Sequence, residues 1–502
     1  MVFIKFKERN NEYRRWLILF SINAVLVFIY YNIYIFQRHY GLDDYLMIKN
    51  PVELEDNALQ NGRYALWGMY VILNKIGLNP VIYQKTFGMI LSLSFAICAT
   101  DITRNIAVES GIDKFRTILA INCGAILLFA NVFVTEWYTF VLSYPQWIMS
   151  TVSSVYSAIF IVQEKVYKKV MGFLLLVVAA NSYQTTLAWY AFLVMLFLWL
   201  KNRDNFNWKV IIKQTLCVAL PAFFVIIINI ILTNIFIKLN IVTSSSRYTN
   251  VYFNLNNIKA IILGQRSIWL EGQGMLGHGF LLICLCALII MIIGLVINKS
   301  ISINSIVYCI CILIGGQVVI YIPDLLMRTG LTLRSITPLF AIFTVLIVFL
   351  VLHIKNSKHM LIIIGVAAFL LAGNFIATQK MAIASLQTNI LEEYEAHVLF
   401  SHIKEYEKKE NTKILYIGFC QDSKSMARYK EIDIFPYDEL YKKAYIVSWA
   451  DVFAVNYYTG QNYVKKEVPE NVKEYFLDKD WNEFNVQEQV VFQGDTVYWC
   501  VY

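Results

Sequence analysis

Two adjacent carboxylates, Asp43 and Asp44, stand in the stretch "YGLDDYLM", shortly after the first long apolar run of the chain. Repulsion between neighbouring carboxylates tends to raise the proton affinity of one of them. One member of such a pair can therefore act as a general base while the other orients it or a bound ion. An acidic pair after a helix is, taken alone, more often a solvated loop, so its interpretation depends on what else lies on the same side of the protein.

A second group of residues has the types expected around a phosphate. A glutamate between two apolar segments is costly unless it is paired or functional, and arginines bind phosphate oxygens through two parallel hydrogen bonds. Each of these residues also has a structural interpretation, because arginines extend to lipid headgroups and a Tyr-Gln pair is common at a helix junction. The group comprises Arg63 in "NGRYALW", Glu136 in "TEWYTF", Tyr183 and Gln184 in "NSYQTTLAWY", and Arg328 and Arg334 in "MRTGLTLRS".

The elements that must position these residues are membrane helices. The chain has 502 residues, of which 58% are hydrophobic and 16% are charged, whereas soluble domains carry roughly 25% charged residues. Apolar runs recur that are long enough to cross a hydrocarbon core of ~30 Å. The sequence predicts a polytopic α-helical membrane protein with about eleven spans, at 16–36, 82–101, 116–134, 138–162, 168–181, 183–200, 210–236, 279–297, 302–321, 335–353 and 359–378.

The loops predict the orientation of the chain. With the basic amino terminus "MVFIKFKERNNEYRR" in the cytoplasm, Lys and Arg are about three times denser in the inner connections than in the outer ones, as the positive-inside rule requires. The basic residues of the cytoplasmic loops thus account for the net charge of +8, and we expect no nucleic-acid partner. This threading places the acidic pair, the Tyr-Gln pair, Glu136 and the arginines together on the extracytoplasmic side of the plasma (inner) membrane.

The carboxyl-terminal part differs in character from the rest of the chain. We expect a transmembrane domain over 1–380 and a small extracytoplasmic α/β domain over 381–502. The latter begins with an amphipathic helical stretch, "NILEEYEAHVLFSHIKEYEKKE". Strand-like runs follow in "TKILYIGF", "KAYIVSWADVFAV" and "QGDTVYWCVY". Cys420 and Cys500 lie in this part, and the sequence leaves open whether they form a disulfide.

An acidic outer loop with outward arginines suits transfer of a sugar from a lipid-phosphate donor. The isoprenoid tail of the donor stays between helices, and arginines hold its phosphate and offset the charge that grows on it as the bond breaks. A carboxylate takes the proton of the acceptor hydroxyl. Asp43 and Asp44 suit that role. We expect no required cofactor and no metal, although the acidic pair can also hold Mg²⁺ or Mn²⁺.

The ordered set "GLDDY", "NGRYALW", "TEWYTF" and "NSYQTTLAWY" resembles the bacterial Gtr-type glucosyltransferases, which are similar to the wider GT-C superfamily. The resemblance covers residues 10–380. It implies that Asp43 or Asp44 is the base and that Arg63 and Glu136 line the donor site. It also implies an inverting transfer of a hexose, glucose, from a polyprenyl-phosphate sugar to a cell-surface glycan such as O-antigen or teichoic acid. A flippase and a donor synthase would then act before this protein.

Two alternatives remain at this point. A flippase or transporter for a lipid-linked glycan would place its charges near the bilayer midplane, whereas here they collect at helix ends. A polysaccharide polymerase or ligase would use a large outer loop with several arginines. The connection 237–278 keeps that alternative open through Arg247, Arg266, Glu271 and His278.

Overall fold

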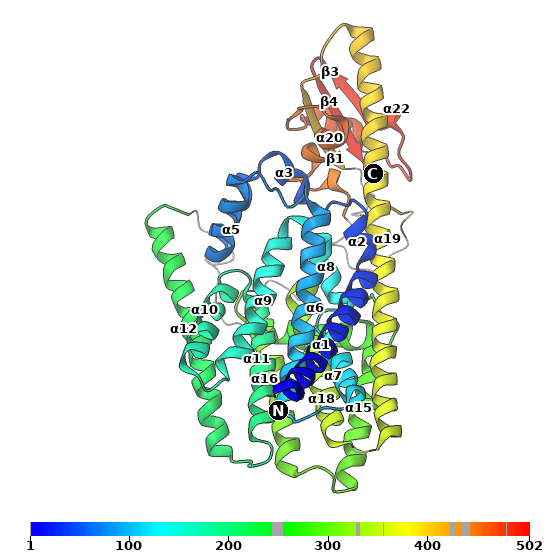
Figure 1. Cartoon of the computed structure of the whole chain (residues 1–502). Coiled ribbons are helices and arrows are strands. Elements are labelled where there is room, and N and C mark those ends of the chain that lie inside the picture. Colours follow the sequence, from blue (N-terminus) through cyan, green and yellow to red (C-terminus); the bar gives the residue numbers. More distant parts are fainter. Residues whose placement is uncertain are drawn as a thin grey trace.

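The computed structural model describes residues 2–242, 255–327, 332–354, 356–421, 428–430, 432, 442–477 and 479–502. Most of the chain is helical, and its long helices form one bundle (Figure 1). The bundle consists of α1 (Val2–Tyr30), α6 (Gln84–Glu109), α7 (Phe115–Ile126), α9 (Tyr144–Ile161), α10 (Val166–Ala180), α11 (Leu187–Asn202), α12 (Trp208–Lys238), α15 (Phe280–Ile297), α16 (Ile303–Met327), α18 (Ala341–His353) and α19 (Ser357–Glu410).

Within the described residues, eight helical segments are long and apolar enough to cross a membrane. The other three segments that the sequence predicts as spans form α7, α9 and α10, which have 12, 18 and 15 residues. These helices are shorter or contain more polar residues than the eight segments. The structure is therefore that of a polytopic helical protein, and the count of eleven stays a prediction. The eight segments are Tyr13–Tyr30, Gln84–Glu109, Gln184–Asn202, Trp208–Lys238, Phe280–Ile297, Ile303–Ile322, Leu333–His353 and Ser357–Glu410.

A polar network inside the bundle fixes how three of these helices pack. Asn23 of α1 and Asn122 of α7 exchange side-chain hydrogen bonds of 2.9 and 2.7 Å. Asn23 also donates to Thr100 of α6, and Thr103 of the same helix donates to Asn122. All four side chains are buried. Amide and hydroxyl groups in an apolar bundle are stable only when they satisfy one another, so this network sets the register of α1, α6 and α7.

Short helices connect the long ones and carry the polar residues of interest. Figure 1 shows that α3 and the C-terminal strands lie at the end of the bundle away from the N-terminus. The short elements are α2 (Asn32–Phe36), α3 (Asp44–Lys49), α4 (Val52–Gln60), α5 (Tyr64–Lys75), η1 (Val132–Val134), α8 (Thr135–Thr139), η2 (Val141–Ser143), η3 (Gln184–Thr186), α17 (Leu333–Ile336) and η4 (Thr337–Phe340). A longer helix, α14 (Leu255–Glu271), precedes α15.

The C-terminal part contains a four-stranded sheet of order β2-β1-β4-β3. β1 is parallel to β2 and β4, and β3 is antiparallel to β4. Cys420 and Cys500 are paired in register in the β1–β4 ladder, and no disulfide joins them in the structure. The elements are β1 (Tyr416–Gln421), η5 (Ala444–Ile446), α20 (Asp451–Thr459), β2 (Val464–Lys465), α21 (Glu470–Leu477), α22 (Val486–Gln489), β3 (Val490–Gln493) and β4 (Thr496–Val501).

One expectation for this part was wrong in detail. The run "KAYIVSWADVFAV" is not a strand, because it forms η5, a turn and the start of α20. A short apolar run fits a buried helix as well as a strand, and α20 buries Val452 and Val455 one helical turn apart. The membrane helix predicted to end at 378 continues without a break as α19, which has 54 residues. The boundary between 380 and 381 falls inside that helix, and the division into two domains stays a prediction.

Candidate active site

Asp44, the first residue of α3, is completely buried. Its Oδ2 accepts a hydrogen bond from the backbone N–H of Gly41 at 2.7 Å, and its Oδ1 accepts one from the N–H of Leu142 at 3.0 Å. Burial raises the pKa of this carboxyl to about 7, although the two N–H groups act in the opposite direction. Asp44 thus fastens the loop before α3 to η2, on a different part of the chain.

Asp43 has a different environment. It is half-buried, and its Oδ1 accepts a hydrogen bond of 2.9 Å from the indole N–H of Trp449, which lies just before α20. The two adjacent carboxylates therefore point to different partners. Asp44 faces the helical bundle, and Asp43 faces the C-terminal part, where its side chain remains accessible.

Gly41 brings this loop close to α8. A Cβ atom at this position would lie 3.1 Å from the backbone oxygen of Thr139 and 3.5 Å from both Asp44 Oδ2 and the ring of Phe140. The loop thus lies against α8 at a distance that suits glycine. The ring of Phe140 in turn lies under the guanidinium of Arg334, with 5.3 Å between Cζ and the ring centroid. A single ring therefore separates the acidic loop from an arginine.

Glu136 and Arg334 form a doubly hydrogen-bonded pair. Arg334 donates from its guanidinium to Oε1 at 2.5 Å and from its backbone N–H to Oε2 at 2.6 Å. Glu136 is fully buried, whereas 27% of the Arg334 side chain is exposed. The buried glutamate lies in the short helix α8, and it fixes both the backbone and the side chain of Arg334. The partly exposed guanidinium remains able to meet an anion.

Tyr183 contacts Arg63 and lies near Arg334. The Arg63 guanidinium lies over its ring at 5.2 Å, and the tyrosine interacts electrostatically with Arg334, Arg63 and Glu136. Arg63 also donates to the side chain of Gln146 at 3.2 Å. The ring of Trp147 packs edge-on against Tyr183 at 4.7 Å. Tyr183 thus has two cationic side chains and the ring of Trp147 as neighbours.

Tyr70 connects the arginine side of the site to the acidic loop. Its hydroxyl donates to the backbone oxygen of Leu142 at 2.9 Å, one peptide group from the N–H that binds Asp44. It interacts electrostatically with both Arg63 and Asp44. The residues that the structure brings together are Asp43, Asp44, Arg63, Glu136, Tyr183 and Arg334.

The remaining predicted site residues are placed less directly or lie outside the description. Gln184 begins η3 and is half-buried. Its only link to the other site residues that the structure describes is that it follows Tyr183 in the chain. Arg328 and Arg247 lie outside the described residues. Arg266, Glu271 and His278 are exposed, on α14 and the turn that follows it.

Among the residues that the structure describes, no group of three or more His, Cys, Asp or Glu side chains has the arrangement of a metal site. Asp43 and Asp44 supply two carboxylates. Mg²⁺ in proteins often uses only one or two carboxylates together with water and substrate phosphate, so independence from metal stays a prediction.

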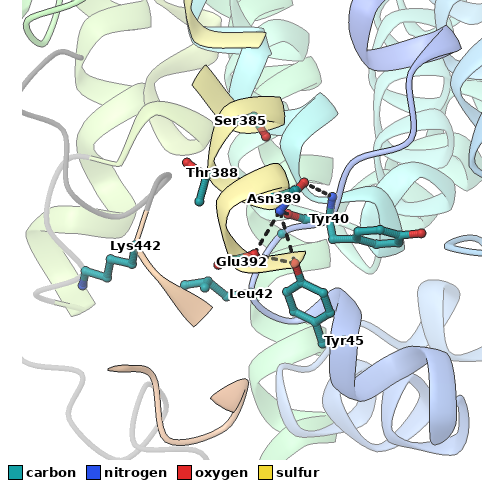
Figure 2. Close-up of a pocket in the computed structure, with 9 residues that line it drawn as sticks. Tyr40, Leu42, Tyr45, Ser385, Thr388, Asn389, Glu392 and Lys442 are labelled. Carbon is teal, nitrogen blue, oxygen red and sulfur yellow. Dashed lines mark hydrogen bonds between the residues drawn. The ribbon is translucent and has the colours of Figure 1, made fainter. Parts of the chain in front are cut away.

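A set of contacts between the acidic loop and the C-terminal part was not predicted from the sequence. Glu392 of α19 is buried and accepts hydrogen bonds from the Tyr45 hydroxyl and from the backbone N–H of Ala444, both at 2.6 Å. Asn389, one turn earlier, exchanges hydrogen bonds with the backbone of Tyr40. Figure 2 shows Asn389 and Glu392 pointing from α19 toward Tyr40 and Tyr45.

Tyrosines of α20 complete this contact. The Tyr45 hydroxyl lies 2.7 Å from that of Tyr458, and the hydroxyls of Tyr40 and Tyr457 are hydrogen-bonded as well. Lys49, at the end of α3, donates to Gln461 and Asn462 of the C-terminal part. The sequence signal for this contact is weak, because tyrosines and a glutamate on an amphipathic helix are ordinary in a soluble domain. The contact seats the C-terminal part directly on the loop that carries Asp43 and Asp44.

The site and the bundle can now be compared with known proteins. The family model for glucosyl transferase GtrII matches residues 32–337, which is more than half of the chain and includes all the site residues of the bundle. The chain belongs to the glucosyl transferase GtrII family. This confirms the resemblance found in the motifs, and it makes the protein a glycosyltransferase with a glucosyl transfer function. Neither the curated proteins nor the solved structures contained a match.

The match to the GtrII family ends at residue 337. It therefore includes α3, α5, α8, η3 and α17, which contain or directly follow the acids, the arginines and Tyr183. It does not include α19 or the part of the chain that follows it, although Glu392 of α19 and Trp449, just before α20, bind residues of the acidic loop. Membership in a family of transferases also decides between an enzyme and a flippase in favour of the enzyme.

Proposed function

We propose that this glycosyltransferase moves glucose from a polyprenyl-phosphate sugar to a cell-surface glycan on the extracytoplasmic face of the plasma membrane, with inversion at the anomeric carbon. The single observation that supports this best is the grouping of two arginines and an acidic loop at one end of an apolar helical bundle. A lipid donor requires that combination, because its tail stays in the membrane while its phosphate needs cationic partners at the edge.

The roles of the residues follow from their exposure and their partners. Asp43 is the base, because it is the accessible carboxylate of the pair. It removes the proton of the acceptor hydroxyl, whose oxygen attacks the anomeric carbon as the bond from that carbon to the phosphate oxygen breaks. Arg63 and Arg334 bind the polyprenyl phosphate that leaves and stabilise its added negative charge.

Asp44 and Glu136 act as positioning residues in this proposal. Asp44 is fully buried, and each of its oxygens already accepts a backbone N–H. It holds the loop so that Asp43 faces the acceptor. Glu136 fixes Arg334 from the buried side. Fixed charges of this kind stabilise a transition state without the cost of reorganising during the reaction.

The side of the membrane is inferred from charge. The basic amino terminus lies at the opposite end of the bundle from α3 and the sheet (Figure 1). Basic residues favour the cytoplasmic side, which supports placing the site outside. A donor synthase and a flippase would then supply the sugar lipid. The polymerase alternative depends on the connection 237–278, whose described polar side chains Arg266, Glu271 and His278 are exposed and are not among the partners of the site.

The experiment uses the purified full chain with three donors that carry labelled glucose. These are polyprenyl-phosphate glucose, UDP-glucose and a polyprenyl-diphosphate oligosaccharide. The acceptor is the envelope glycan fraction from cells in which the gene is deleted. We expect transfer from the monophosphate lipid and an α-linked product from a β-linked donor. Equal transfer from UDP-glucose, or preferred transfer from the diphosphate, would contradict the proposed donor.

A further inference from the structure

Trp449 is an unusually exposed tryptophan beside the proposed base. Its side chain is 53% exposed, whereas tryptophan is highly buried on average. The two other tryptophans of the C-terminal part follow that rule, since Trp499 is fully buried and Trp481 is 8% exposed. An exposed tryptophan that also contacts the proposed base requires a specific explanation.

The position of Trp449 relative to Asp43 is fixed. The indole N–H donates to Asp43 Oδ1 at 2.9 Å, so the edge of the ring is held while a large part of the side chain remains accessible. The residue precedes α20, whose Tyr457 and Tyr458 bind the tyrosines on either side of the acidic pair. These contacts hold the turn that carries Trp449 over the loop.

The surroundings of Trp449 are polar. Lys465 donates to the backbone oxygen of Ser448, the residue before it, at 2.8 Å. Lys465 also forms an ion pair with the carboxylate of Asp451, two residues after it. A tryptophan that anchors a protein in headgroups is accompanied by an apolar surface that enters the membrane. The charged neighbours of Trp449 do not provide that surface, so membrane anchoring explains its exposure poorly.

We propose that Trp449 and Asp43 form the acceptor subsite, in which a pyranose ring of the glycan packs on the indole face while its reacting hydroxyl meets the Asp43 carboxylate. The face of an aromatic ring is electron-rich and its partners present positive edges. The C–H groups on one face of a pyranose provide such a partner, and its hydroxyls can donate to a carboxylate. The inference rests on the proposed function. It adds that the part of the acceptor that contacts the protein is a neutral sugar ring.

The test measures transfer of labelled glucose from polyprenyl-phosphate glucose to the envelope glycan fraction from the deletion strain, at increasing glycan concentration. Trp449→Ala removes both the ring and the N–H, and Trp449→Phe keeps a ring face but removes the N–H. Tyr475→Ala is the matched control, because Tyr475 is another exposed aromatic of the C-terminal part, at 48% exposure.

We expect Trp449→Ala to raise the KM for the glycan roughly tenfold, with a fall in kcat at saturating glycan of about threefold or less. Trp449→Phe should raise that KM by about threefold or less, and Tyr475→Ala should leave both constants unchanged. An unchanged KM in Trp449→Ala would overturn the inference. So would equal effects of Ala and Phe, because Trp449 would then act only through its hydrogen bond to Asp43.

The same assay separates this inference from the proposed function. If the wild-type protein transfers glucose and Asp43→Asn does not, but Trp449→Ala binds the glycan normally, only the acceptor subsite is wrong. If the wild-type protein transfers nothing from the lipid donor, the proposed function fails and this inference fails with it.

Discussion

The guanidinium of Arg334 and the carboxylate of Glu136 are 198 residues apart in the chain and 2.5 Å apart in the fold. The pair is asymmetric, because the glutamate is fully buried and the arginine is partly exposed. This asymmetry indicates that Glu136 holds Arg334 in position from the buried side of the pair.

The first prediction concerns this pair. Arg334→Ala should destabilise the protein by about 3–5 kcal/mol, because it leaves a buried carboxylate without its guanidinium, and it should abolish most transfer. The double variant Arg334→Ala, Glu136→Ala should lose less stability than the sum of the single variants. Thermal unfolding in detergent measures these differences. Lys473→Ala, which breaks the exposed pair with Glu470, is the control and should cost about 0–1 kcal/mol. Additive single effects would contradict the pairing.

The second prediction is a pH dependence that arises from Asp44. Its carboxyl has a pKa of about 7 in the fold, raised by burial, and protonation converts one of its oxygens to a hydroxyl that no longer accepts well from a backbone N–H. Transfer should therefore fall as the pH drops through about 7. Between the ordinary pKa of an aspartate, about 4, and about 7, the folded state binds more protons than the unfolded state. Stability should thus decline as the pH rises through that window and be constant above it.

Rates and unfolding free energies measured from pH 5 to 9 check both parts of this prediction. Asp44→Asn should lose the inflection near pH 7 in the transfer rate, even though its activity is low. If the inflection persists in Asp44→Asn, another group is responsible for it.

The third prediction concerns the close approach of Gly41. Gly41→Ala places a methyl group 3.1 Å from the backbone oxygen of Thr139, so the loop must shift by a few tenths of an ångström. We expect a fall in kcat of roughly tenfold, because the shift disturbs the hydrogen bond from Gly41 to Asp44. Gly68→Ala is the control, because its methyl group meets no atom within 4 Å. That helical substitution should be neutral or stabilising by up to about 1 kcal/mol. Equal activities of the two variants would contradict the role of the loop contact.

The fourth prediction concerns the attachment of the C-terminal part. Glu392→Ala removes the acceptor shared by the Tyr45 hydroxyl and the Ala444 N–H. Each donor left unsatisfied costs about 1–3 kcal/mol, so this variant should be cleaved faster by protease near α20 and should transfer less. Glu393→Ala, at the adjacent exposed position, should behave as the wild type. Normal protease resistance in Glu392→Ala would show that this contact does not hold the parts together.

Polar residues stand out in an apolar chain, and this made the candidate residues visible in the sequence. Contacts in the fold link the residues that were predicted to share one side of the membrane, namely Asp43, Asp44, Arg63, Glu136, Tyr183 and Arg334. Their roles and the side of the membrane stay predictions. Their pairing could not be predicted. Nothing in a local pattern indicates that Glu136 binds the backbone and side chain of Arg334 and not Arg63.

The C-terminal contact was beyond sequence reasoning for a related reason. Trp449 and Glu392 lie in a region of ordinary soluble composition, where an aromatic or an acidic residue does not stand out. The same region misled the secondary-structure prediction, because the short apolar run before and within α20 has no decisive period. The number of membrane spans is also hard to predict from the sequence. The helices α7, α9 and α10 pack against other helices of the bundle, and their apolar segments are shorter or less apolar than those of the eight candidate spans.

The central claim is that the accessible carboxylate of the first loop is the base, and the most direct measurement is the transfer rate of Asp43→Asn. Its rate from polyprenyl-phosphate glucose should fall by about 10²–10⁴-fold, with wild-type membrane insertion, thermal unfolding and donor binding. Asn can still accept the hydrogen bond from Trp449, so the loop should keep its position. A correctly folded Asp43→Asn that transfers glucose at the wild-type rate would contradict the account.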